Sequence, residues 1–311
     1  NKYDKNHSIK NIYNKNFSYT EKNFSNTANL QIFENLINSN NYHMCLPVLD
    51  KDKRLIDIIN YQNFLHKEKK IKCVRVKIPA RVSFVGGGAD FSEYLTKSRS
   101  YILSSTIQKY LTVSLYPRKD NKISISNYTN GNFFEFKDYD ELKKFKKNNL
   151  IINILKNKIL NYGFKLEIIS DFKPKTGLGG SSILSIGLIK ALNLFQNIHE
   201  EEKFELINQA YKSERLDSKI KGGWQDYLSS TFGGLNWIDM YQSDFYVHQI
   251  NLEKKTLLEL ENNLVLVNIG SRTTSESIQK QRIEKYKKNP KQKIKQFEKM
   301  RNLSIDMKNC L

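Results

Sequence analysis

Residues 173–192 read KPKTGLGGSSILSIGLIKAL, and this stretch constrains the fold more than any other. Three glycines and two serines lead from a predicted strand (164–171) into a predicted apolar helix (181–195). A helix N-terminus carries unpaired N–H groups and partial positive charge, and glycines allow a bound group to approach the backbone. The stretch therefore predicts an anion site, with an ordinary capped helix after a tight turn as the alternative.

Two common phosphate-binding patterns do not fit this loop. The Walker A spacing G-x-x-x-x-G-K-[ST] is absent, and so is the dinucleotide spacing G-x-G-x-x-G. Other parts of the chain must therefore decide between an anion site and a simple turn.

Charge and composition narrow the function classes. The 311 residues carry a formal net charge of +19, from 51 basic and 32 acidic residues. The basic residues are mostly lysines spread along the chain without a nucleic-acid-binding motif, so we favour solvated lysine-rich faces over a nucleic-acid surface. No apolar run approaches the roughly 20 residues of a membrane helix.

Targeting signals and cysteines point to the cytoplasm. The first 26 residues lack the apolar core of a secretory signal. Cys45, Cys73 and Cys310 lie far apart and show no metal-ligand spacing, so we expect reduced thiols in a cytoplasmic protein.

A small N-terminal unit is expected over residues 28–66, after a polar lead-in at 1–27. The pattern predicts a helix from residue 29, a strand at 44–50, a tight turn and a second strand at 55–60. LPVLDKDKRLIDII resembles half of a CBS domain, a family whose halves pair around adenosine-type ligands. Since only one half is present, we favour a structural remnant or docking module over a ligand sensor.

The remainder of the chain alternates strands with helices, which indicates an α/β or α+β enzyme fold rather than a repeat array. The expected strands are at 73–85, 110–117, 122–128, 164–171, 233–238 and 263–270, and the expected helices at 139–161, 181–195, 201–215 and 274–310.

Three segments in order resemble the GHMP small-molecule kinase superfamily: ARVSFVGGGADF, PKTGLGGSSILSIGLIKAL and GGWQDYLSSTFGGLNWI. The third resembles most closely the D-glycero-D-manno-heptose 7-phosphate kinase branch, which LVLVNIGSRTTSESI also fits. The resemblance covers about residues 73–311. It implies an α+β, two-lobed GHMP kinase-type fold, with a ribosomal-protein-like N-terminal lobe at 73–245 and the start of a C-terminal lobe at 246–311.

The resemblance also implies a nucleotide site with ATP and Mg²⁺ as cofactors. The residues expected around the ATP phosphates are Gly177, Leu178, Gly179, Gly180, Ser181 and Ser182. Ser181 would contact Mg²⁺, although the adjacent Ser182 is not separated from it by the pattern. Glu214 would be the Mg²⁺ carboxylate, with a solvated helix position as the alternative.

Asp226 would orient or deprotonate the attacking hydroxyl, with a helix N-cap as the alternative. The residues expected around the sugar are Arg81, Ser83, Gly87, Gly88 and Asp90, although a glycine run at a strand end is also a common turn. Arg75 and Arg272 are further candidates for contacting a substrate phosphate.

These expectations combine into an ATP-dependent sugar-phosphate kinase. It would phosphorylate the anomeric hydroxyl of D-glycero-D-manno-heptose 7-phosphate, for nucleotide-heptose and surface polysaccharide synthesis. The alternatives are a fucose-type kinase and a non-catalytic protein that binds or senses nucleotide. A sugar phosphate is the expected partner, nucleic acid and membrane are not, and homo-oligomerisation is left open.

One departure from the family concerns its third, glycine-rich motif. No glycine follows Gly270, so this motif is missing. We therefore expect a truncated or partial copy, in which the helix at 274–310 exposes an apolar face.

Overall fold

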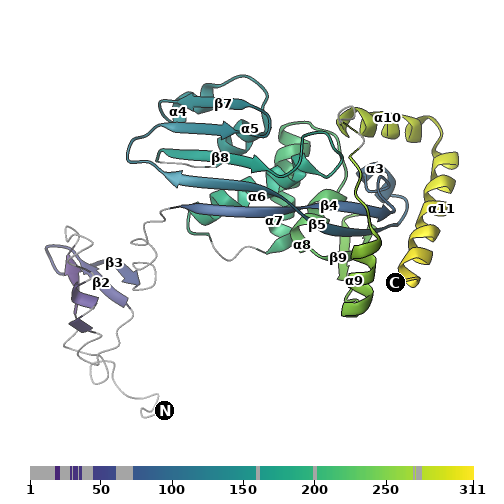
Figure 1. Cartoon of the computed structure of the whole chain (residues 1–311). Coiled ribbons are helices and arrows are strands. Elements are labelled where there is room, and N and C mark those ends of the chain that lie inside the picture. Colours follow the sequence, from purple (N-terminus) through teal and green to yellow (C-terminus); the bar gives the residue numbers. More distant parts are fainter. Residues whose placement is uncertain are drawn as a thin grey trace, which may run out of the picture. The chain divides into compact units, whose positions relative to one another are not determined.

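The chain divides into two compact units, Asn1–Lys70 and Ile71–Leu311, in the computed structural model (Figure 1). The structure describes residues 18–21, 29, 31–33, 35–36, 45–60, 73–158, 162–198, 202–268, 270 and 275–311. Within these ranges no helix has both the length and the apolar composition needed to cross a bilayer.

The first unit contains a small sheet in the order β1-β2-β3. Its strands are β1 (Thr20–Glu21), β2 (Cys45–Leu49) and β3 (Leu55–Asn60). β2 and β3 form the predicted antiparallel hairpin, whose turn is held by Asp50 accepting from the N–H groups of Asp52 and Arg54 at 2.9 and 2.8 Å. The expected lead-in contributes β1, which pairs in parallel with β2.

The second unit is built on a sheet that has seven strands among the described residues. The long strand β5 lies at its centre: β4 pairs along one side, and β9 and β8 pair with its first and second halves on the other. The strands are β4 (Val74–Val85), β5 (Ser100–Pro117), β6 (Ile123–Asn127), β7 (Asn132–Phe136), β8 (Phe164–Ser170), β9 (Leu235–Tyr241) and β10 (Asp244–Gln249).

Helix α6 (Gly180–Phe195) packs on this sheet and is buried over most of its length, as its apolar sequence requires. A Cβ added at Gly187 would lie only 3.2 Å from Val113 and 3.3 Å from Ile78, so the helix backbone lies close to β4 and β5. The helices α7 (Lys203–Tyr211) and α8 (Gln225–Phe232) pack against it and complete the layer. This mixed α/β core agrees with the predicted class.

Three predicted elements differ in the structure. The helix expected at 139–161 is two short helices, α4 (Tyr139–Lys144) and α5 (Leu150–Lys156), because the Asn149 side chain caps a new helix start. The helix expected at 201–215 continues past α7 as a π-helix, Lys212–Asp217. Residues 264–268, predicted as part of a strand, form none and are exposed.

The C-terminal helix is also two helices, α10 (Ser275–Lys288) and α11 (Pro290–Asn309). Pro290 removes a backbone donor, and Asn289 caps the second helix. Their apolar residues pack against the short helix α3 (Ser92–Leu95) and the residue before it: the rings of Phe297 and Tyr94 are 4.7 Å apart, and those of Tyr286 and Phe91 5.5 Å. The expectation that this segment exposes its apolar face is therefore wrong for Phe297 and Tyr286, but it is confirmed for Leu303, Ile305 and Met307 of α11, which are exposed.

Candidate active site

A cavity of about 580 Å³ lies at one end of α6. Its walls come from the end of β4, the loop before α6, the start of α8 and one face of α10. Apart from the two further candidates Arg75 and Arg272, the structure brings the predicted site residues to this cavity: Arg81, Ser83, Gly87, Gly88, Asp90, Gly177, Leu178, Gly179, Gly180, Ser181, Ser182, Glu214 and Asp226.

The glycine–serine loop has the backbone conformation that its glycines allow. Gly177 and Gly179 adopt φ of 83° and 81°, in the left-handed region that other residues rarely occupy. Gly179 is the N-cap of α6, and because it has no side chain it leaves the first N–H groups of the helix without a cap. The cavity therefore meets a helix N-terminus suited to a phosphate.

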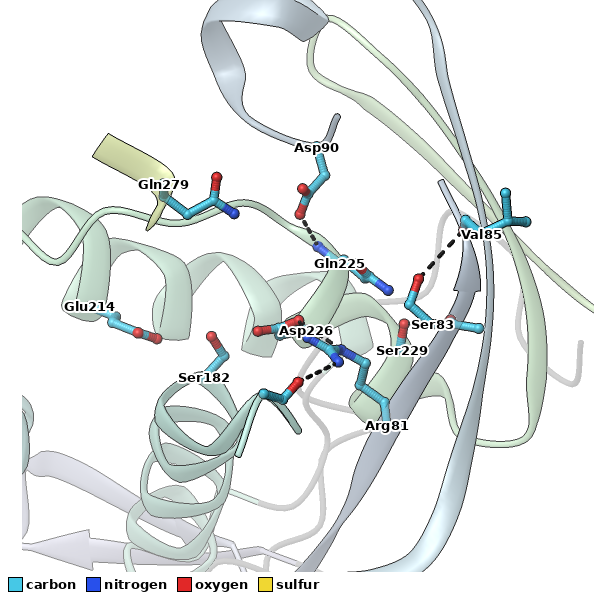
Figure 2. Close-up of polar contacts among 12 residues, drawn as sticks. Arg81, Ser83, Val85, Asp90, Ser182, Glu214, Gln225, Asp226, Ser229 and Gln279 are labelled. Atoms are coloured by element: carbon cyan, nitrogen blue, oxygen red, sulfur yellow. Dashed lines mark hydrogen bonds and ion pairs between the residues drawn. The ribbon is translucent and has the colours of Figure 1, made fainter. Parts of the chain in front are cut away.

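Asp226 lies against this same turn. A Cβ added at Gly179 would be 3.2–3.3 Å from the carboxyl group and Cβ of Asp226. Arg81 holds the carboxylate through Oδ1, which accepts from Nε at 2.8 Å and also from Nη2. The same guanidinium donates to the carbonyl of Gly177 at 2.9 Å, so one arginine ties the loop to Asp226 (Figure 2).

Asp226 keeps one oxygen free of protein donors. No described residue donates to its Oδ2, and the side chain is 25% exposed. The N-cap of α8 is Trp224, so the alternative reading of Asp226 as that cap is wrong. A held but partly exposed carboxylate can orient a hydroxyl group and accept its proton.

Helix α8 is fixed by contacts on several sides. Its first turn is capped by Asp90, which is buried and accepts from the N–H of Gln225 at 3.0 Å through Oδ2. Further along, Ser229 and Ser104 share a hydrogen bond of 2.7 Å between α8 and β5. Asp90, predicted to bind sugar hydroxyls, thus also positions the helix that carries Asp226.

Glu214 is the second carboxylate at the cavity, and it is fully buried. Its Oε1 accepts from Arg215 Nη1 at 2.9 Å, and its Oε2 accepts from the hydroxyls of Tyr227 and Ser185. The alternative reading of Glu214 as a solvated helix position is therefore wrong. Arg215 also donates to Ser182 Oγ at 3.1 Å, which links this cluster to α6.

The charges of this cluster depend on one another. Burial is the largest influence on the pKa of Arg215 and lowers it, but the charge of Glu214 together with the smaller contributions of Tyr227, Asp226 and Tyr211 outweighs burial, so the pKa lies above its ordinary value. Burial and the charge of Glu214 both raise the pKa of Tyr227 well above its ordinary value, so the phenol stays a donor. The cluster is a neutral, internally bonded unit.

The side chains expected to hold magnesium are in part already engaged in protein hydrogen bonds. Both oxygens of Glu214 already accept hydrogen bonds, and Ser182 accepts from Arg215. Ser181 is exposed in the first turn of α6. Among the described residues, no group of three or more His, Cys, Asp or Glu side chains is placed to hold a metal. The roles of Ser181 and Glu214 toward Mg²⁺ remain predictions.

The glycine pair before Trp224 makes room for two charged side chains. A Cβ at Gly222 would lie 2.2 Å from the guanidinium of Arg215, and one at Gly223 would lie 2.0 Å from Asp90 Oδ2. Glycine at both positions therefore leaves these two side chains in place, a role that the sequence alone did not reveal.

Helix α10 contributes residues that the sequence did not predict for the site, among them Gln279 and Arg282. Arg282 Nη1 donates to the carbonyl of Gly88 at 3.2 Å, across 194 residues of sequence. Gly88 adopts a φ of 95°, which favours glycine, and a Cβ there would lie 1.9 Å from this nitrogen and displace the Arg282 side chain. No sequence signal marked them, because only the tertiary fold brings α10 to the cavity.

Positive charge exceeds negative charge around the cavity. Among the described residues that line it, six are basic and three acidic, with Lys173, Lys175 and Lys221 among the basic ones. An anionic ligand is therefore favoured. Arg75 lies elsewhere on β4 and donates to Ser114 and Tyr116, so its predicted phosphate contact is not supported, while Arg272 lies outside the described residues.

Comparison with known proteins adds independent evidence. Residues 144–234, from α4 through the end of α8, match the GHMP kinases N terminal domain. The D-glycero-alpha-D-manno-heptose 7-phosphate kinase of Campylobacter jejuni is 34% identical over 206 residues, which are 63% of this chain and 59% of that protein. The bifunctional fucokinase/GDP-fucose pyrophosphorylase of Arabidopsis thaliana is 24% identical over 63% of this chain and 20% of that protein.

Solved structures agree on the fold. A crystal structure of a Campylobacter jejuni protein assigned as a sugar kinase superposes with a TM-score of 0.53 at 30% identity, covering 62% of this chain and 63% of that one. The second unit therefore has the mixed α/β fold of the GHMP kinases. The chain spans less than two thirds of the length of the curated relatives it matches.

Proposed function

We propose that this protein is an ATP-dependent sugar-phosphate kinase that phosphorylates the anomeric hydroxyl of D-glycero-D-manno-heptose 7-phosphate. The observation that carries the proposal is the position of Asp226 directly over Gly179, at the uncapped N-terminus of α6. A phosphate on the helix N-terminus and a hydroxyl at Asp226 would then be neighbours, as phosphoryl transfer requires.

The loop and helix would bind the nucleotide. The N–H groups at the start of α6 and the side chains of Lys173 and Lys175, which line the cavity, supply positive charge to the phosphates. Left-handed Gly177 and Gly179 let the backbone approach them closely. Mg²⁺ normally accompanies ATP, but we assign it no step because Glu214 is engaged by Arg215, Tyr227 and Ser185.

Asp226 would act on the acceptor. The acceptor oxygen forms a bond to the γ-phosphorus while the bond from that phosphorus to the β–γ bridging oxygen breaks, which leaves ADP. The hydroxyl proton passes to Asp226 Oδ2, the oxygen without a protein donor. Because Arg81 holds the other oxygen of this carboxylate, Asp226 is positioned to orient the hydroxyl and to accept its proton.

The position of Arg282 favours an acceptor that already carries a phosphate group. Of the three arginines that line the cavity, Arg81 is paired with Asp226 and Arg215 with Glu214. No carboxylate among the described residues pairs with Arg282, which lies beside Gly88 at the predicted sugar end. A guanidinium without a carboxylate partner is suited to the phosphate that the acceptor already carries.

An assay of ADP release from Mg-ATP, with D-glycero-D-manno-heptose 7-phosphate as acceptor, tests the proposal on the whole chain. We expect turnover that needs the sugar phosphate and disappears in Asp226→Asn. Nucleotide binding without turnover, unchanged in that variant, would instead identify a non-catalytic nucleotide-binding protein.

A fucose-type kinase is the second candidate, favoured only by the similarity to the Arabidopsis thaliana fucokinase. L-fucose carries no phosphate and would leave Arg282 without an anionic partner. Faster turnover of L-fucose than of heptose 7-phosphate in the same assay would decide for this candidate.

Several further statements stay predictions. They are the role in nucleotide-heptose and surface polysaccharide synthesis, the cytoplasmic location, the absence of nucleic-acid partners and the CBS-like character of the first unit. The three cysteines are free and exposed, in agreement with the expectation of reduced thiols.

A further inference from the structure

Gln225 is a buried side chain that the proposed mechanism does not use. It lies beside Asp226 in the first turn of α8, lines the cavity and is only 4% exposed. Its backbone N–H is held by Asp90, but its side-chain Nε2 has no hydrogen-bond partner among the described residues. A buried amide donor without a partner is rare in folded proteins, because leaving it unpaired costs free energy.

The amide is located at the predicted sugar end of the cavity. Figure 2 shows the Gln225 side chain extended from the start of α8 toward Ser83, with Asp226 and Arg81 beneath it. A Cβ added at Gly87 would lie 2.9 Å from Gln225 Oε1 and 2.9 Å from Ser83 Oγ. Glycine at position 87 therefore leaves space next to the amide.

The chemistry of an amide suits a sugar hydroxyl. A hydroxyl group both donates and accepts, and a half-turn of the terminal torsion lets the glutamine present either Nε2 or Oε1. A phosphate would use only the donor, and an apolar ligand would use neither. The positively charged side chains around the cavity can bind phosphates, so a neutral amide next to Asp226 is best matched to a hydroxyl.

We infer that Gln225 is a specificity-determining residue that binds a hydroxyl of the acceptor adjacent to the one that reacts. This inference rests on the proposed function, because it needs an acceptor that presents one hydroxyl to Asp226 and another to the neighbouring residue on α8. Gln225 thereby selects a polyol acceptor over an alcohol with a single hydroxyl. Asp90 holds the backbone N–H of Gln225, which fixes the position of the Gln225 amide relative to the Asp226 carboxylate.

Gln225→Met tests the inference, since methionine keeps the length and volume of the side chain and removes both amide groups. With heptose 7-phosphate as acceptor, we expect kcat/KM to fall roughly tenfold or more, mostly through KM. Gln209→Met is the matched control, because Gln209 lies on α7 outside the cavity lining, where its amide donates to Glu205 and accepts from Lys158; its kinetics should equal those of the wild type.

A set of monodeoxy acceptors separates recognition from a structural role. Wild type should discriminate against the analogue that lacks the hydroxyl bound by Gln225, and Gln225→Met should lose that discrimination while keeping the others. Because the amide nitrogen has no hydrogen-bond partner among the described residues, the unfolding midpoint of Gln225→Met without ligand should equal or exceed that of wild type.

Three results would overturn the inference. They are wild-type kcat/KM in Gln225→Met, unchanged discrimination across the deoxy series, and an unfolding midpoint lower by several degrees, which would reveal a structural partner for the amide. In each case turnover by wild type leaves the proposed function standing. Absence of wild-type turnover with every sugar phosphate refutes the proposed function itself, and the inference with it.

Discussion

Two arginine–carboxylate pairs line the same cavity, and they differ in how exposed the carboxylate is and in how many of its oxygens accept hydrogen bonds from the described residues. In the pair of Arg81 with Asp226, the carboxylate is 25% exposed, and only Oδ1 accepts from the described residues. In the pair of Arg215 with Glu214, the side chains are 9% and 1% exposed, and both carboxylate oxygens accept hydrogen bonds.

The two pairs therefore have different roles. A buried carboxylate whose two oxygens both accept protein hydrogen bonds can hold α6, the π-helix and α8 together but is poorly placed to accept a proton from a ligand. The Asp226 carboxylate faces the cavity with one oxygen to which no described residue donates, and it can accept a proton there. The carboxylates are 12 positions apart in the sequence, and nothing in that spacing tells the two situations apart.

Asp226→Asn should have the largest effect on activity and little effect on stability. The amide oxygen can still accept from Arg81, but the group can no longer take a proton, so phosphoryl transfer should fall about 10²–10⁴-fold. Turnover measures the effect on activity, and thermal unfolding measures the effect on stability. Asp244→Asn, at an exposed position on β10, is the control; activity within tenfold of wild type would contradict the role of Asp226.

Glu214→Gln should show the reverse, with its main effect on stability. It leaves the Arg215 charge buried without a partner, so the free energy of unfolding should fall by about 3–5 kcal/mol. Chemical denaturation checks this, with the exposed Glu205→Gln on α7 expected to stay within about 0.5 kcal/mol of wild type. Undiminished stability would show that the second pair is not structural.

Tyr227→Phe makes a smaller change at the Arg215–Glu214 pair, because it leaves the ion pair in place. The change removes one donor to a charged oxygen and keeps the buried ring, so we expect a loss of about 1.5–3 kcal/mol. Tyr246→Phe, whose side chain is exposed on β10, should be neutral by the same measurement. Equal effects of the two changes would mean that Glu214 does not depend on the phenol.

Gly179→Ala should lower the free energy of unfolding less than Tyr227→Phe does, and it should also disturb Asp226. A left-handed φ of 81° costs alanine about 1–2 kcal/mol, and its Cβ would press on the Asp226 carboxyl group and lower turnover. Gly131→Ala is the matched control, since Gly131 has a φ of 64° but no atom within 4 Å of an added Cβ. Equal losses of turnover would exclude the contact with Asp226 as the cause.

The sequence predicted much of this site because its residues lie in three short motifs. The glycine loop, the end of β4 and the start of α8 each contain a short sequence pattern that reflects the local backbone conformation. The sequence did not predict that Glu214 is buried and bonded to Arg215 and Tyr227, because this environment arises only when three helical segments pack together. Arg282 was missed for the same reason, since it reaches the cavity from a helix that looks merely charged.

Some fold errors have local causes that could have been recognised. Asn149 and Asn289 each cap a new helix, and Pro290 starts one, so two expected long helices are each two shorter ones. The exposed residues Leu264–Val267 are different. Their apolar sequence predicts a strand, but a strand needs a neighbouring strand for its hydrogen bonds, and none of the described strands pairs with them.

The most direct test of the account is a single-turnover measurement of phosphate transfer from γ-labelled ATP to heptose 7-phosphate, with wild type, Asp226→Asn and Glu214→Gln at a temperature where all three are folded. We predict labelled sugar bisphosphate from wild type, transfer slowed at least 100-fold in Asp226→Asn with nucleotide affinity unchanged, and a much smaller loss in Glu214→Gln. Transfer by Asp226→Asn at the wild-type rate, or none by wild type, would contradict the account.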